Sequence, residues 1–210
     1  MTLVHRNPML DDQPPYPQIV VISGPSGVGK DSVLIRMREL GIPFHFVVTM
    51  NSRPKRPTEQ DGVDYHFVTS QHFETLIEQG ELLEWAMVYG HYRGVPKCEV
   101  RQAIDSGQDV VIRVNVDGAA TIRRIVPESI HIFIAPGSAG ELRRRLAARR
   151  TESAEDMERR LALAEEEMAQ VVHFDYVVIN RDNRLDDAVQ QIQAIMLAEK
   201  HRVHCRRIQL

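Results

Sequence analysis

The chain has 210 residues, of which 43% are hydrophobic and 26% charged, a composition typical of a folded globular protein rather than a disordered one. The sequence contains no apolar run near the roughly 18 residues that span a bilayer, and the net charge of -3 gives no general attraction to nucleic acid or anionic lipid. The two cysteines, Cys98 and Cys205, stand far apart and argue against a disulfide framework or a zinc site. We therefore expect a cytoplasmic protein without nucleic-acid or membrane partners.

The predicted elements begin after a Pro-rich stretch, residues 1–17, which fits neither a signal peptide nor a transit peptide and is expected to be a loose leader. The apolar run 18–23 predicts a buried strand, and 31–40 has helical spacing with Gly41 as a stop. Further continuous apolar runs predict strands at 44–48, 109–116, 130–135 and 176–180. Helical patterns cover 97–106, 119–126, 141–150, 155–172 and 185–200. Strands that alternate with helices predict an α/β sandwich around a parallel sheet.

Two segments interrupt this alternation. Residues 49–97 contain turn residues, one short helix and aromatic strand-like pieces, which predicts an inserted lobe. The Arg-rich segment 138–159 is a second candidate insertion. The core domain would then consist of residues 18–48, 98–137 and 160–200. The basic residues 201–210 are expected to form a frayed, solvated tail.

Between the first predicted strand and helix lies the phosphate-binding motif GxxxxGK, as Gly24-Pro25-Ser26-Gly27-Val28-Gly29-Lys30. Its glycines let backbone N–H groups turn inward around an anion, and Lys30 can reach the β- and γ-phosphates of a nucleotide. Asp31 and Ser32 follow, where Ser or Thr usually comes directly after the lysine. Asp31 has two interpretations: it holds Mg²⁺ through water, or it is an acid that favours the helix N-terminus.

A second group of polar residues lies in the inserted segment. Arg53 and Arg56, stiffened by two prolines, can converge on one phosphate, and Tyr65 offers a hydroxyl to the same group. The alternative is a solvated basic loop, which is the usual meaning of clustered charges.

Together these motifs resemble guanylate kinase. The phosphate loop is followed in order by RPKRPTEQDGVDYHF (53–67), GELLEWA (80–86), GVPK (94–97), GAA (118–120), IFIAP (132–136) and DYVVIN (175–180). The resemblance covers about residues 18–200, and the Gly-Lys-Asp loop with Arg113 and Gly94-Val95 is most similar to the plastid-type branch. It implies a P-loop three-layer sandwich with a five-stranded parallel sheet, a GMP-binding lobe at 49–97 and a helical lid at 138–159.

The resemblance also implies an activity: transfer of the γ-phosphoryl group of ATP to GMP and dGMP, with Mg²⁺. The residues that it assigns to GMP are Thr49 and Glu84 for guanine, and Arg53, Arg56 and Tyr65 for the phosphate. In the lid it assigns Arg145 and Arg149 to the transferring phosphoryl group, with Arg160 as a further phosphate contact. Asn180 would lie near adenine. The catalytic residues on this interpretation are Lys30, Arg53, Arg145 and Arg149.

Besides Asp31, several positions depart from the family pattern, among them Asp117, which replaces Gln. Asn115 replaces a carboxylate expected on the GMP side, and Arg93 stands where a phosphate-contacting tyrosine is usual. Val95 has no hydroxyl to offer guanine, so base selectivity is expected to be less strict.

Two alternatives stay open. A ribose 1,5-bisphosphate phosphokinase would share the Gly-Lys-Asp-Ser loop, and a non-catalytic guanylate-kinase-like module would use the lobe to bind a phosphorylated peptide. Residues 53–67 and Glu84-Trp85 argue against the first, and the intact loop with Lys30 argues against the second. The protein could be either a monomer or a homodimer.

Overall fold

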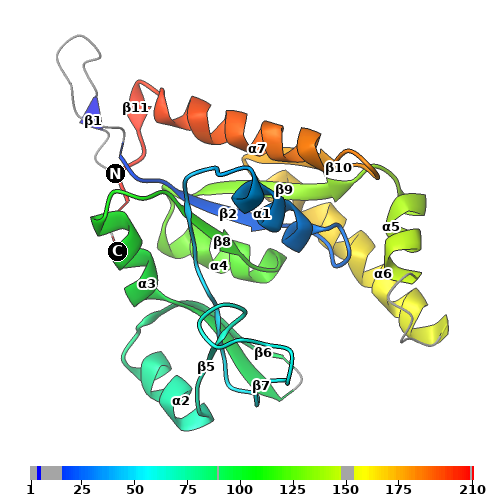
Figure 1. Ribbon diagram of the computed structural model, residues 1–210, viewed down its shortest axis with the longest axis horizontal. Helices are drawn as coiled ribbons and strands as arrows, with labels where there is room; N and C mark the ends of the chain where they lie inside the picture. Colours follow the sequence, from blue (N-terminus) through cyan, green and yellow to red (C-terminus); the bar gives the residue numbers. More distant parts are fainter. Residues whose placement is uncertain (1–3, 6–15, 89, 148–153, 209) are drawn as a thin grey trace.

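The computed structural model describes residues 4–5, 16–88, 90–147, 154–208 and 210. Its centre is a parallel sheet of five strands in the order β10-β9-β2-β8-β3 (Figure 1). The strands are β2 (Ile19–Ser23), β3 (His45–Phe46), β8 (Val110–Arg113), β9 (Ile130–Pro136) and β10 (Tyr176–Asn180). All five residues of β2 are buried, as a strand covered on both faces requires. The predicted five-stranded parallel sheet is confirmed.

Helices cover both faces of this sheet. Val20 and Ile22 pack with α1 (Lys30–Glu39) and α7 (Leu185–Lys200) on one face. Ile19 and Val21, which point the other way, pack with α3 (Lys97–Asp105) and α4 (Val116–Ile125). This alternation along β2 builds the three layers that the sequence predicts.

Near Asn115, the predicted end of a strand and the predicted start of the next helix are both wrong. The strand expected at 109–116 ends at Arg113, and the helix expected from residue 119 begins at Val116. The reason is Asn115, whose side-chain oxygen accepts a hydrogen bond from the Gly118 N–H at 2.9 Å and so caps the helix.

A second, smaller sheet lies beside the first, with strands in the order β5-β4-β7-β6 (Figure 1). Its members are β4 (Met50–Asn51), β5 (His66–Phe67), β6 (Leu82–Val88) and β7 (His91–Pro96), and α2 (Ser70–Glu78) packs on it through Phe73. Glu99 of α3 connects this sheet to the core, because its carboxylate bonds His45 of β3 at 2.8 Å, His66 of β5 at 3.2 Å and the Val48 N–H at 3.0 Å.

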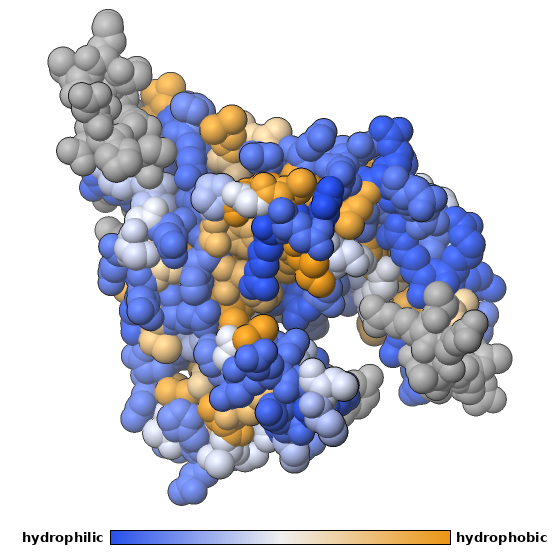
Figure 2. All heavy atoms as spheres, viewed as in Figure 1, coloured by the Kyte–Doolittle hydropathy of each residue, from blue (hydrophilic) through white to orange (hydrophobic). Residues whose placement is uncertain are grey.

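On the other side, α5 (Ala139–Ala147) and α6 (Ala154–Ala169) form an arm that projects from the core, followed by the 3₁₀ helix η1 (Gln170–His173). Figure 2 shows a hollow between this arm and the small sheet. The carboxyl ends of the core strands, where α/β proteins place their ligands, therefore lie between two projecting parts.

The prediction that residues 201–210 form a frayed, solvated tail is wrong. Glu199 has a side-chain exposure of only 1%, and it accepts hydrogen bonds from Tyr176 at 2.5 Å, Arg202 at 3.2 Å and Arg206 at 3.1 Å. Beyond them β11 (His204–Cys205) pairs antiparallel with β1 (Val4–His5) of the expected leader. A buried carboxylate needs cations, so the arginines that looked like a solvated run hold the tail against the core. Within the described ranges, every helix is too short or too polar to cross a membrane.

Candidate functional site

The phosphate-loop motif connects β2 to α1, as predicted. Gly24, Gly27 and Gly29 adopt φ of +137°, +86° and +90°, which side-chain-bearing residues rarely reach. A Cβ on Gly24 would lie 2.2 Å from the carbonyl oxygen of Ile134, so only glycine fits there. Lys30 donates to the carbonyl oxygens of Gly24 at 2.5 Å and Pro25 at 2.9 Å, which holds the ammonium over the loop. The loop has the shape and charge of an anion cradle.

Two of the predicted nucleotide residues contact this loop. The buried Asn180 donates to the Val28 carbonyl at 2.8 Å. Arg145 of α5 donates to the same carbonyl at 3.0 Å, to the Asn180 carbonyl at 2.8 Å and to Asp182 at 2.9 Å. Arg160 is half-buried on α6, whereas Arg149 lies outside the described residues. The arm therefore supplies a cation to the edge of the phosphate loop.

Asp31 lies in the first turn of α1 and forms an ion pair with Arg113 at the end of β8. Its side chain is 62% exposed, and the neighbouring Ser32 is also exposed. Burial lowers the pKa of Arg113, so Asp31 is the acid that offsets this partly buried cation. Among the described residues, no group of three or more His, Cys, Asp or Glu side chains could hold a metal ion. Asp31 is a single, exposed carboxylate, and Mg²⁺ sites use only one or two carboxylates together with substrate phosphates.

The small sheet gathers a cationic cluster. Cζ of Arg53 lies 5.4 Å from the centre of the Tyr65 ring, and Cζ of Arg93 on β7 lies 5.8 Å from it. Glu59 accepts hydrogen bonds from both terminal nitrogens of Arg53, one of them at 2.7 Å, and this pairing lowers the pKa of Glu59 to about 2. The Nε atoms of Arg53 and Arg93 are buried without a hydrogen-bond partner. Two buried donors of this kind around one tyrosine predict an anionic ligand.

Arg56 lies on the same loop, and its backbone N–H donates to Glu59 at 2.9 Å, while its side chain is exposed. Glu59 thus holds the loop around Arg53 in place. No role for this residue was predicted from the sequence.

Glu84 of β6 lies where the small sheet meets the core. Its residue exposure is 9%, and burial alone raises the pKa of its carboxyl to about 7. Gly118 of α4 makes room for it, since a Cβ there would stand 3.0 Å from Glu84 Oε1. A buried acid with a raised pKa at a junction of two units is typical of a functional site.

The other residues that the sequence analysis linked to GMP differ in burial and in their contacts. Thr49 is half-buried between β3 and β4, and its carbonyl accepts the His66 N–H at 3.0 Å. Asn115 is exposed but has its side-chain oxygen engaged in capping α4. Val95 is fully buried in the core cluster of α3 and α4, so its side chain serves packing.

Sequence reasoning missed Glu167. Its carboxylate accepts the backbone N–H of Ser26, inside the phosphate loop, at 3.1 Å. It is the last of three consecutive glutamates, which on a helix suggest a solvated face. The available signal was its spacing of one helical turn from the buried Ala164 on α6.

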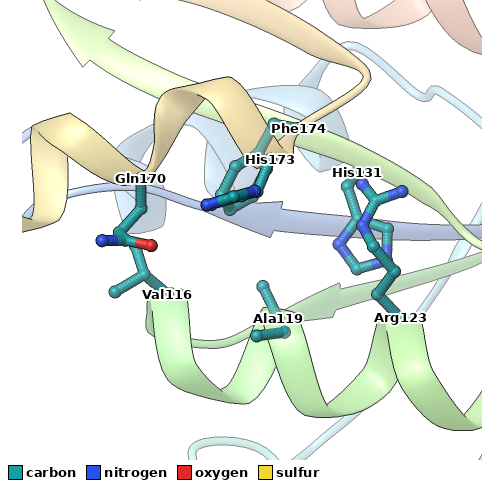
Figure 3. Close-up of a pocket in the computed structure, with 8 residues that line it drawn as sticks. Val116, Ala119, Arg123, His131, Gln170, His173 and Phe174 are labelled. Atoms are coloured by element: carbon teal, nitrogen blue, oxygen red, sulfur yellow. The ribbon is translucent and has the colours of Figure 1, made fainter.

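A separate cavity of about 330 Å³ lies between α4 and η1 (Figure 3). Ala119, Phe174 and His131 line it, and burial is the main cause that lowers the pKa of His131 to about 4. None of the site residues predicted from the sequence lines this cavity. The described residues predicted for the site lie instead on the phosphate loop, on the small sheet and its loops, on α4, on the arm and at the end of β10.

Comparison with known proteins adds an independent result. A protein-family model described as guanylate kinase matches residues 16–199. The chain is 50% identical over 198 residues to guanylate kinase 2, chloroplastic/mitochondrial, of Oryza sativa subsp. japonica, covering 94% of this chain and 70% of that protein. It is 42% identical over 184 residues to a guanylate kinase of Symbiobacterium thermophilum, covering 88% and 86%.

The fold has a solved counterpart as well. A crystal structure of guanylate kinase from Anaplasma phagocytophilum superposes with a TM-score of 0.70 at 28% identity, over 92% of this chain and 90% of that one.

Proposed function

This chain belongs to the guanylate kinase family, and we propose that it transfers the γ-phosphoryl group of ATP to GMP, giving ADP and GDP. The observation that carries the proposal is the buried Glu84 carboxylate at the junction of the small sheet and the core. Guanine presents parallel N–H donors at N1 and N2, and one carboxylate can accept both. Adenine offers no such pair, so Glu84 would select the base.

The cationic cluster of the small sheet is proposed to hold the GMP phosphate. Arg53 and Arg93 each bring a buried Nε without a hydrogen-bond partner, and the Cζ atoms of their guanidinium groups lie 5.4 and 5.8 Å from the centre of the Tyr65 ring. Arg56 adds an exposed guanidinium from the same loop. Arginine forks are suited to phosphate oxygens, and Arg93 and Arg56 would offset a dianion directly. Arg53, in contrast, would have to share its fork with Glu59.

The phosphate loop is proposed to hold the ATP phosphates, with Lys30 as the side-chain cation and the N–H groups around Gly27 and Gly29 as backbone donors. Asn180, which is bonded to Val28, lies beside the loop where the adenosine end would extend. When bound, Mg²⁺ would neutralise charge on the β- and γ-phosphate oxygens. Asp31 would hold it through water, in exchange for part of its contact with Arg113.

Phosphoryl transfer asks for alignment and charge neutralisation rather than covalent chemistry by the protein. We propose that residues 49–97 act as the GMP-binding lobe and residues 138–159 as the lid. Arg145 and Arg149 would approach the transferring group from the lid, and Arg160 would contact the phosphates from α6. Closing the hollow seen in Figure 2 would exclude water and prevent hydrolysis of ATP.

The comparisons give no support to the sugar-phosphate kinase or to the non-catalytic module. The deciding experiment is coupled ADP release with ATP and Mg²⁺ and four acceptors: GMP, dGMP, AMP and ribose 1,5-bisphosphate. We expect turnover with GMP and dGMP, and a loss in Lys30→Ala of about 10²- to 10³-fold, the size typical of a lost charge-stabilising donor. The proposal would be overturned by turnover with ribose 1,5-bisphosphate alone, or by the absence of turnover with all four acceptors. The cytoplasmic location and the monomer or homodimer state stay predictions.

A further inference from the structure

The contact between Glu167 and the phosphate loop is not explained by the proposed catalytic roles. A carboxylate from α6 accepts the Ser26 N–H at 3.1 Å, in a loop whose N–H groups suit a phosphate. An acid at this place repels a nucleotide that arrives with several negative charges. Its position therefore needs a reason other than direct substrate binding.

The surroundings of Glu167 define its electrostatics. Lys30 of α1 favours its charged form, Asp117 of α4 disfavours it, and the Ser26 N–H stabilises the carboxylate. The largest effect is burial, and the net result is a raised pKa of Glu167. Lys30 itself lies back on the Gly24 and Pro25 carbonyls. The loop therefore has an internal anion, and its lysine has internal acceptors.

We propose that Glu167 is a stand-in for the nucleotide phosphates: its carboxylate accepts the Ser26 N–H of the phosphate loop and is neutralised by proton uptake when nucleotide binds. This inference rests on the proposed nucleotide site at the loop. Glu167 is then a positioning residue that keeps the loop shaped for an anion before ATP arrives. The cost is direct competition with the incoming phosphates.

Two consequences separate this role from a purely structural contact. Glu167→Gln keeps the shape and an oxygen acceptor but removes the charge, so nucleotide should bind more tightly, by about three- to tenfold for one relieved like-charge contact. In the unmodified protein, phosphates beside Glu167 should favour its protonated form, so binding should take up protons. That part of the proton uptake should disappear in Glu167→Gln.

The experiment is calorimetric titration of the full chain with ADP in the absence of Mg²⁺, at pH 7, in two buffers with different ionisation enthalpies. Glu166→Gln is the matched control, since it removes the same charge from the adjacent, exposed position of α6. We expect tighter ADP binding and reduced proton uptake in Glu167→Gln, with neither change in Glu166→Gln. Equal or weaker affinity in Glu167→Gln, or unchanged proton uptake, would overturn the stand-in role.

A third variant keeps this test separate from that of the nucleotide site. If the unmodified protein binds ADP and Lys30→Ala weakens binding, the proposed site holds, and the Glu167 result judges only the inference. If Lys30→Ala leaves ADP affinity unchanged, the site at the loop is itself wrong.

Discussion

Replacing Glu84 by glutamine tests the base-recognition argument with two measurements of opposite sign. The amide has nearly the same shape, but it carries no charge and presents N–H donors toward the N–H donors of guanine. Removing one partner of a buried, charge-assisted hydrogen-bonded pair costs about 2–4 kcal/mol, which corresponds to a loss of roughly 30- to 1,000-fold in kcat/KM for GMP. The KM for ATP should stay near that of the unmodified protein.

The pH dependence gives the second half of the activity prediction. With a pKa of about 7, Glu84 is roughly one-tenth ionised at pH 6 and nine-tenths ionised at pH 8. Because the free enzyme must present the carboxylate, kcat/KM for GMP should rise about tenfold between these pH values. The same comparison in Glu84→Gln removes this part of the rise and leaves any part that belongs to GMP itself.

Stability should change in the opposite direction. The pKa of Glu84 in the folded protein, about 7, lies above its ordinary value of 4.5, so the folded protein holds this proton more tightly than the unfolded chain. Protonation of Glu84 makes its full contribution to the free energy of unfolding below pH 4.5. This contribution, about 3 kcal/mol, is lost as pH rises through 7. Glu84→Gln should therefore be more stable than the unmodified protein at pH 8 by about 1–3 kcal/mol, with little difference at pH 4.5.

Urea unfolding at pH 4.5 and 8, beside coupled ADP release from pH 6 to 8, measures both effects. Glu78→Gln, at an exposed position of the same lobe, is the control that should change neither. The reasoning is refuted if Glu84→Gln retains kcat/KM for GMP within threefold, or if it is less stable than the unmodified protein at pH 8.

Three further predictions concern other parts of the molecule. Arg93→Met should raise the KM for GMP about ten- to a hundredfold through loss of hydrogen bonds to a charged group, and an unchanged KM would remove Arg93 from the phosphate site. Asp31→Ser should weaken apparent Mg²⁺ affinity in an activity titration; an unaltered titration would leave Asp31 only its ion pair with Arg113. Arg206→Ala should destabilise the protein by about 1–3 kcal/mol, because the buried Glu199 loses one of its cations. Urea unfolding tests this, with Arg207→Ala as the comparison, and equal stability of both variants would contradict it.

The core was predictable because its signals are local. β10 and α7 have the bounds that the sequence predicts, since a continuous apolar run and an amphipathic pattern define them. The error near Asn115 came from competition between two local signals. Apolar residues alternate from Val114 to Val116 and suggest a strand, but the Asn115 side chain caps a helix instead.

The site was predictable in its motifs but not in the partners of those motifs. Nothing local indicates that Arg53 is held by Glu59, or that Arg145 lies on the Val28 carbonyl 117 residues away. Glu167 was missed for the same reason, because only the packing of α6 distinguishes it from the exposed Glu165 and Glu166. Contacts over long sequence separations depend on tertiary packing, which residue patterns do not encode directly.

The way the small sheet joins the core has a consequence for protein engineering. The chain leaves the core after Val48 and returns at Lys97, and the strands on either side of these points are antiparallel neighbours with Met50 opposite Gly94. The two junctions are therefore close together, and Glu99 of the core holds one of them through the Val48 N–H. An insert whose ends already meet adds little loop-closure entropy to its host. If residues 49–97 act as the proposed GMP-binding lobe, exchanging them between relatives should transfer acceptor preference, provided that the residues of α3 and α4 that pack on Val95 are matched to the new lobe.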